Sequence, residues 1–136
     1  MNVPFCQHIH LACCDIKAMA DFWVKGFGAK LEEFRKFGAL EGAVLDINSG
    51  RTKLYLREQP CERQDKAAAR SGVDHIGMAV PDLDASLAEL TALPGVALAK
   101  EPFMSKDMRC AFINGPEGIS VEVMEYASPL QNIARS

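Results

Sequence analysis

The sequence lacks the features of a membrane or secreted protein. It contains no apolar run near the roughly 20 residues that a membrane span needs, and its amino terminus has neither the basic start nor the apolar core of a secretory signal. We therefore expect a cytoplasmic protein with no membrane partner. Lys and Arg are scattered along the chain and the formal net charge is -3, so we expect no nucleic-acid partner either.

The sequence also lacks a cysteine framework. Its five cysteines form an odd set without a CxxC pair, and cytosolic thiols stay reduced, so no disulfide scaffold is expected. Cys13 and Cys14 lie in an apolar run, where burial is favoured over thiol chemistry. With 136 residues, of which 49% are hydrophobic and 24% charged, the chain is predicted to be one globular domain that buries its own core.

What the chain does contain is an internal repeat with a shift of 67 residues. The segment His8–Ile16 matches the segment His75–Leu83, with His, Ile, Ala and Asp at the same places in both. The same shift pairs three further positions: Ala18 with Ala85, Gly28 with Gly95, and Leu31 with Leu98. Such a repeat predicts two copies of one supersecondary unit.

Each copy has the same order of patterns. An apolar stretch is followed by an Asp suited to cap a helix, and then by an amphipathic segment that a glycine closes. β-like runs come next, near residues 30–34, 43–48 and 52–57 in the first copy and near 97–100, 109–113 and 119–124 in the second. The sequence therefore predicts an α+β fold of two β-α-β-β-β modules, with the helices outside the sheets.

The boundaries of the modules follow from these runs. We place module one at about residues 4–58 and module two at about residues 73–126. Residues 59–72 are polar and poor in large apolar side chains, which predicts a linker that holds a short helical turn near residues 66–69. Residues 127–136 are predicted to be a tail that is weakly ordered or docked on a partner.

Side-chain alternation assigns the strand residues to faces. In the last strand, Val121 and Val123 are predicted to face the helices and Glu122 the concave side, where a carboxylate among apolar neighbours is costly unless a cation or a hydrogen-bond donor meets it. The first strand of each copy places its leading histidine, His8 or His75, on the same concave side. The three side chains are thus predicted to converge.

Convergence of His8, His75 and Glu122 predicts a metal site. Two imidazoles and one carboxylate leave coordination positions open for water or substrate. The simpler interpretation is that the two histidines are core residues made alike by duplication. Because the matched histidines coincide with an inward carboxylate, we predict metal ligation by all three residues.

These residues make the chain similar to the vicinal oxygen chelate superfamily, which groups glyoxalase I, methylmalonyl-CoA epimerase, extradiol dioxygenases, fosfomycin-resistance enzymes and bleomycin-binding proteins. The resemblance runs from Gln7 to Tyr126 and is strongest at residues 75–83 and 112–123. It implies a single glyoxalase-like domain whose two modules form a curved mixed sheet around a metal cup, with one divalent ion (Zn, Mn, Fe, Ni or Co) on the three predicted ligands. It also implies a homodimer, with the cup completed within one chain or by modules of two chains.

The resemblance departs from the family pattern at a fourth ligand position. Counting from His8 the 47 residues that separate His75 from Glu122 leads to Tyr55, where glyoxalase I and the epimerases would have Glu or Gln. In glyoxalase-type isomerases the carboxylate at that place also moves a proton, so a lactoylglutathione lyase is put in doubt. The three-ligand set instead resembles that of the fosfomycin-resistance enzymes and dioxygenases.

His10 and Tyr55 are the candidate catalytic residues. His10 shares the face of His8 and is a candidate for the missing ligand or the base, or else it lines the cup. Tyr55 is a candidate donor to a metal-bound oxygen, or a part of the wall. Three cations are candidates for binding an anionic substrate group: Lys53, Arg57 and Arg109. Their other interpretation is that they are merely solvated.

Two function classes are consistent with the sequence. The first is a divalent-metal-dependent enzyme that chelates a small oxygen-bearing substrate for lyase, isomerase, thiol-transfer or dioxygenase chemistry, with a thiol cosubstrate in one of these branches. The alternative is a non-catalytic protein of the bleomycin-resistance type that binds a drug or metabolite in the same cup without metal.

Overall fold

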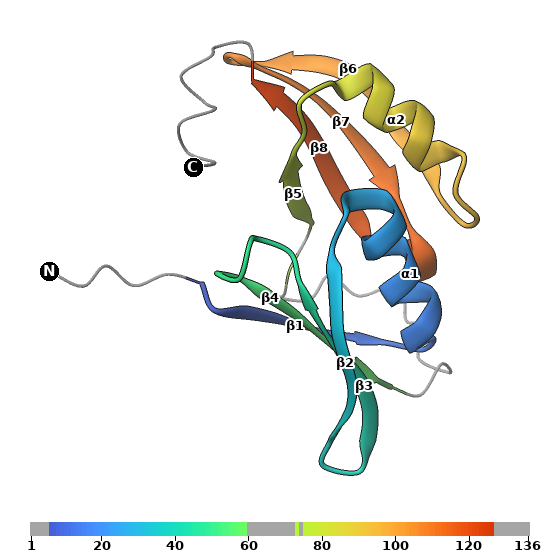
Figure 1. Cartoon of the computed structure of the whole chain (residues 1–136). Helices are drawn as coiled ribbons and strands as arrows, with labels where there is room; N and C mark the ends of the chain where they lie inside the picture. Colours follow the sequence, from blue (N-terminus) through green and yellow to red (C-terminus); the bar gives the residue numbers. More distant parts are fainter. Residues whose placement is uncertain (1–5, 60–72, 74, 127–136) are drawn as a thin grey trace, which may run out of the picture. The chain divides into compact units, whose positions relative to one another are not determined.

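The computed structural model describes residues 6–59, 73 and 75–126 of the chain. The chain divides into two compact units, residues 1–69 and 70–136, each with its own sheet and helix (Figure 1). Three predicted segments lie outside the described residues: the linker apart from Gln59, its helical turn near residues 66–69, and the tail at 127–136. The predicted module boundaries therefore stay predictions.

The first unit has the predicted order of strand, helix and three strands. Its elements are β1 (His8–Cys13), α1 (Ile16–Phe27), β2 (Lys30–Phe37), β3 (Leu40–Asp46) and β4 (Lys53–Glu58). The strands lie in the order β1-β4-β3-β2, with β1 parallel to β4 and the other pairs antiparallel. The helix packs on β2, β3 and β4 and so covers one face of the sheet.

The second unit repeats this topology. Its elements are β5 (Ile76–Ala79), α2 (Leu83–Thr91), β6 (Ala97–Ser105), β7 (Met108–Asn114), the short 3-10 turn η1 (Pro116–Gly118) and β8 (Ser120–Tyr126). The strand order is β5-β8-β7-β6, again with the first and last strands parallel, and α2 packs on β6, β7 and β8. The predicted α+β class and the two β-α-β-β-β modules are confirmed.

The helices begin where the sequence predicts. The Asp15 carboxylate accepts a hydrogen bond from the Ala18 amide at 2.9 Å, and the Asp82 carboxylate accepts one from the Ala85 amide at 3.0 Å. Gly28 ends α1 in the left-handed conformation at φ 68°, which glycine adopts without steric cost. In the second unit α2 ends earlier, at Thr91 with Ala92 as its C-cap, and the glycine of the repeat lies beyond the helix end. Among the described residues, neither helix has the length and apolar character needed to cross a membrane.

Burial follows the predicted alternation. In β1 the side chains of Ile9 and Leu11 are half-buried, whereas His8 and His10 are exposed on the other face. In β8, Val121 and Val123 are fully buried, whereas the residues that alternate with them, Ser120, Glu122 and Met124, are partly exposed. The core of each unit therefore lies between its sheet and its own helix, and the opposite face carries the polar residues of the repeat.

The loop between β2 and β3 is only two residues long, so β2 ends later and β3 begins earlier than the sequence predicts. Phe37 and Leu40 are register partners, and Gly38 between them has φ 65°. A glycine at the first central position suits a two-residue hairpin turn. The longer β2 brings Phe37 to the polar face, where its ring lies over Gly42: a Cβ at that position would collide with it.

The capping aspartates provide a test of the fold. Replacing Asp15 or Asp82 by Ala removes the acceptor for one helix amide, so each variant is expected to lower the free energy of unfolding by about 0.5–2 kcal/mol. Denaturant unfolding followed by circular dichroism measures this change. The Asp→Asn variants at the same two positions keep an acceptor oxygen and serve as controls. Equal losses in the Ala and Asn variants would contradict the capping role.

Candidate metal centre

In the second unit, the side chains of His75 and Glu122 approach each other. His75 immediately precedes β5, and Glu122 lies in β8 as the register partner of Gly77. His75 Nε2 and Glu122 Oε1 are 3.4 Å apart, and the two side chains are 33% and 20% exposed. Two ligand atoms that each lie about 2.1 Å from a tetrahedral ion are about 3.4 Å apart. The pair therefore fits two adjacent ligands of one divalent ion.

The surroundings of Glu122 restrain its carboxylate. The buried Cys110 thiol donates a hydrogen bond to Glu122; burial and, secondly, this carboxylate raise the pKa of the thiol, which stays protonated at neutral pH. The Phe112 ring lies edge to face against His75 with ring centroids 5.1 Å apart. A Cβ at Gly77 would lie 4.0 Å from Glu122 Oε1 and 2.9 Å from a methionine methyl group. Glycine at this position thus makes room for the methionine methyl group.

In the first unit, His8 is held by two neighbours. Its ring is stacked on Tyr55, with centroids 4.2 Å apart and planes at 14°. Its Nδ1 atom lies 2.6 Å from the Gln7 side-chain oxygen. Tyr55 occupies the position that corresponds to Glu122 in the repeat, and its ring forms a wall beside His8.

The structure brings the predicted ligands together in part. His75 and Glu122 are neighbours in one unit, and His8 lies beside His10 and Tyr55 in the other. No group of three or more His, Cys, Asp or Glu side chains arranged for metal binding occurs in the described part of the chain. The set of three ligands stays a prediction.

His10 lies among aromatic rings of the first unit. Its ring centroid is 4.7 Å from that of Phe37 and 5.6 Å from that of Tyr55. The pKa of His10 is lowered from the ordinary value of 6.5, first by desolvation against its neighbours and then by the positive charge of Arg57 and by His8. A neutral imidazole at neutral pH is able to accept a proton.

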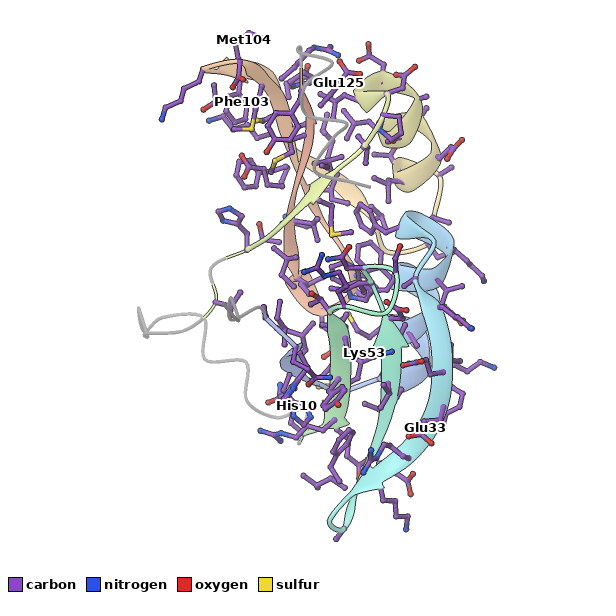
Figure 2. All side chains as sticks on the ribbon, turned by 60° about the vertical axis from the view of Figure 1, so that its left-hand side comes forward. His10, Glu33, Lys53, Phe103, Met104 and Glu125 are labelled. Atoms are coloured by element: carbon purple, nitrogen blue, oxygen red, sulfur yellow. The ribbon has the colours of Figure 1, made fainter. Side chains whose placement is uncertain are left out.

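The two predicted cations of β4 differ in their partners. Lys53 Nζ lies 2.6 Å from Glu32 Oε1 and 4.0 Å from Asp46 Oδ2, so its charge is already neutralised. Arg57 donates to the Glu58 carbonyl at 3.4 Å, and no carboxylate of the described residues lies within ion-pair distance of it. Figure 2 shows His10 and Lys53 on the sheet of this unit. Arg57 is therefore the cation of β4 best able to meet an anion.

Arg109 lies on the opposite face of its sheet from Glu122. It alternates along β7 with Cys110 and Phe112, and its Nη2 atom lies 2.9 Å from Asp84 Oδ1 on α2. The Asp84 carboxylate raises the pKa of Arg109, and the pKa of Asp84 is lowered in return. This ion pair joins strand to helix, and the guanidinium does not point to the predicted concave side.

Sequence reasoning did not single out several residues of the polar faces. Cys110 and Phe112 follow from alternation along β7, a signal that was present in the predicted run 109–113. Phe103, labelled in Figure 2, stacks on Phe112 with centroids 6.1 Å apart, and Lys100 Nζ lies 4.2 Å from its ring centroid. Phe37 was missed because β2 was predicted to end before it.

Comparison with known proteins decides the family. The family model described as the Glyoxalase/Bleomycin resistance protein/Dioxygenase superfamily matches residues 6–123. The chain belongs to this superfamily. Curated protein sequences contain no significant match to it.

Solved structures of the glyoxalase superfamily share the fold. A glyoxalase family protein from Bacillus cereus has a TM-score of 0.78 at 16% identity, with 94% of this chain and 97% of that chain covered. TnmS3, an antibiotic-binding protein from Streptomyces sp. CB03234, has a TM-score of 0.71 at 19% identity, with 93% and 98% covered. A mutant of the fosfomycin resistance protein FosX from Listeria monocytogenes, complexed with Mn(II) and a dihydroxypropylphosphonic acid, has a TM-score of 0.69 at 16% identity, with 98% and 99% covered.

The environment of His10 gives a prediction for this member of the glyoxalase superfamily. Replacing Arg57 by Gln removes a positive charge and is expected to raise the pKa of His10 toward 6.5. An NMR titration of the metal-free protein measures it. The pKa of His10 is lower in the folded state than in the unfolded state, so the unfolded chain takes up the proton first as the pH falls. The free energy of unfolding is therefore expected to decrease as the pH falls through 6.5 toward the folded-state pKa.

The matched control removes the same charge from the exposed surface of α1. Lys17→Gln is expected to leave the His10 titration unchanged, because it lies on the helix and not on the polar face of the sheet. An Arg57→Gln variant whose His10 titrates as in the wild type would contradict the electrostatic coupling.

Proposed function

We propose that this protein is a divalent-metal-dependent enzyme of the glyoxalase superfamily, with His8, His75 and Glu122 as ligands. The observation that carries the proposal is the 3.4 Å separation of His75 Nε2 and Glu122 Oε1, which suits two ligands of one ion. Glu122 is only 20% exposed, and its charge among apolar neighbours is compensated best by a cation. The ion is Zn, Mn, Fe, Ni or Co, since all of these accept imidazole and carboxylate ligands.

The proposed chemistry is proton transfer or nucleophilic addition on a small oxygen-bearing substrate. When bound, the ion supplies Lewis acidity toward a substrate oxygen. His10 acts as the base, since its lowered pKa keeps the ring neutral at neutral pH. Arg57 binds an anionic group of the substrate, and Tyr55 forms part of the wall. Isomerase, lyase and thiol-transfer reactions all use these parts, and dioxygenase chemistry is the remaining branch.

The metal proposal predicts about one equivalent of divalent ion per chain after reconstitution. Replacing His75 by Ala or Glu122 by Gln removes one ligand. If the 10–16 kcal/mol of a four-ligand zinc site is shared among its ligands, each contributes about 3 kcal/mol, so affinity is expected to fall roughly a hundredfold. Elemental analysis and calorimetric titration with Zn²⁺ and Mn²⁺ measure stoichiometry and affinity. His8→Ala is expected to behave like the other two variants.

The matched control for these variants is His10→Ala, which removes an imidazole from the same polar face as His8. It is expected to retain metal and to lose turnover. Wild-type protein with less than about a tenth of an equivalent of every ion tested would overturn the metal proposal. Assays with methylglyoxal plus glutathione, fosfomycin plus thiol, and catechols plus oxygen then separate the reaction branches.

One observation favours a second function, the binding of a drug or metabolite without metal. Four rings, those of His8, His10, Phe37 and Tyr55, lie together on one face of the first unit, with neighbouring centroids 4.2–6.3 Å apart. TnmS3, a neighbour in fold, is an antibiotic-binding protein. Ligand affinity that is unchanged in a metal-free His75→Ala variant would favour this function over the enzyme.

We also propose that the protein is a cytoplasmic homodimer. Sedimentation at several concentrations tests the dimer, and mixing His8→Ala with Glu122→Gln chains tests its relation to the site. If each site takes His8 from one chain and Glu122 from the other, mixed dimers contain one intact site and recover metal binding. If each site is built within one chain, mixing restores nothing.

A further inference from the structure

We propose that Gln7 is a positioning residue, which holds His8 with its proton on Nδ1 and so leaves Nε2 to face a metal ion. The inference rests on the proposed metal centre. It adds to that proposal which ring nitrogen of His8 would bind the ion. It starts from the contact of 2.6 Å between His8 Nδ1 and Gln7 Oε1. This distance is slightly shorter than the usual range for an N–H···O hydrogen bond.

The chemistry of the two groups determines which of them donates. A carboxamide oxygen only accepts hydrogen bonds, so with the Gln7 oxygen facing His8, as in this structure, Nδ1 of His8 is the donor. A neutral imidazole carries one N–H group, and its other nitrogen has a lone pair. With the proton on Nδ1, the lone pair of His8 lies on Nε2. Metal-ligating histidines characteristically donate their second ring nitrogen to such a partner, which fixes both the tautomer and the ring orientation.

The ring plane of His8 is fixed independently by Tyr55. The two rings are nearly parallel, at 14°, with centroids 4.2 Å apart. Stacking on Tyr55 therefore restrains the plane of the imidazole ring. The contact with Gln7 restrains the direction in which Nδ1 points. Rotation of the ring by 180° would break the hydrogen bond to Gln7, because it puts the Cδ2 carbon in the place of Nδ1. The stacking with Tyr55 and the contact with Gln7 both favour the ring orientation in which Nδ1 faces Gln7.

The backbone of Gln7 is anchored to β4, although the residue precedes β1. Its carbonyl accepts a hydrogen bond from the Lys53 amide at 2.7 Å. One residue earlier, the Cys6 carbonyl accepts one from the Thr52 hydroxyl at 2.8 Å. The segment that carries Gln7 is thus tied to the strand that carries Tyr55. Both restraints on His8 are built on the same pair of strands.

The test measures the tautomer of His8 directly in metal-free protein. At a pH near 8, where ordinary imidazoles are neutral, ¹⁵N NMR of labelled protein distinguishes the protonated from the unprotonated ring nitrogen. Wild-type His8 is expected to carry its proton mainly on Nδ1. Gln7→Leu removes the acceptor, so the fraction protonated on Nδ1 is expected to fall. Gln7→Glu keeps an acceptor oxygen and is expected to preserve the wild-type tautomer.

Metal affinity is the second readout. Loss of the Gln7 acceptor is expected to weaken Zn²⁺ or Mn²⁺ binding about 10–100-fold, whereas Gln7→Glu is expected to retain it. The matched control is Gln59→Leu, the same substitution just beyond the other end of β4, where the Gln59 amide bonds to the Cys13 carbonyl. This control is expected to alter neither the His8 tautomer nor metal affinity.

The outcomes separate this inference from the proposed function. A wild-type His8 with its proton on Nε2, or a tautomer that Gln7→Leu leaves unchanged, would overturn the role of Gln7 even if metal binds. A wild-type protein that binds no metal but shows the Gln7-dependent Nδ1 tautomer would overturn the metal centre and leave the positioning of His8 established. Loss of affinity in Gln59→Leu equal to that in Gln7→Leu would assign the effect to general destabilisation and overturn the specific role.

Discussion

The parallel pairing of the first and last strands of each unit determines which side chains share its polar face. In the first unit β1 runs beside β4, so His10 is the register partner of Tyr55. In the second unit β5 runs beside β8, so Gly77 is the partner of Glu122. A slip by one residue in either pairing would exchange the core and polar faces of a strand. The buried leucines of β4 and valines of β8 oppose such a slip, because burying each apolar side chain contributes about 1.5–3 kcal/mol.

Equivalent positions of the two strand pairings carry different side chains in the two units. Where the second unit has Gly77 paired with the Glu122 carboxylate, the first has His10 and Tyr55 packed against each other and against Phe37. The second unit thus presents an anionic group, and the first presents aromatic rings and a neutral imidazole. A duplicated scaffold has kept its geometry while the chemistry of its two polar faces has diverged.

Much of the fold could be predicted because its signals are local. Asp15, Asp82 and Gly28 mark helix ends through their own hydrogen bonds and backbone angles, and period-two alternation assigns each strand residue to a face. The partners of individual side chains could not be predicted in this way. That Lys53 and Arg109 are neutralised by Glu32 and Asp84 depends on neighbouring elements at distances of 21 and 25 residues along the chain. The sequence predicts that His75 and Glu122 meet because the repeat marks the histidine and alternation along the last strand places the carboxylate on the same face.

The polar groups of both units are restrained before any ligand arrives. Glu122 accepts a hydrogen bond from the buried Cys110 thiol, and His8 is held by Gln7 and Tyr55. Ordering a side chain costs up to about 2 kcal/mol of conformational entropy. In this chain that cost falls on folding rather than on binding, which leaves more of the interaction free energy for affinity. The restraints come from residues that do not themselves bear the predicted ligand atoms. Substitutions at these supporting positions therefore change the orientation of the ligand side chains without removing them.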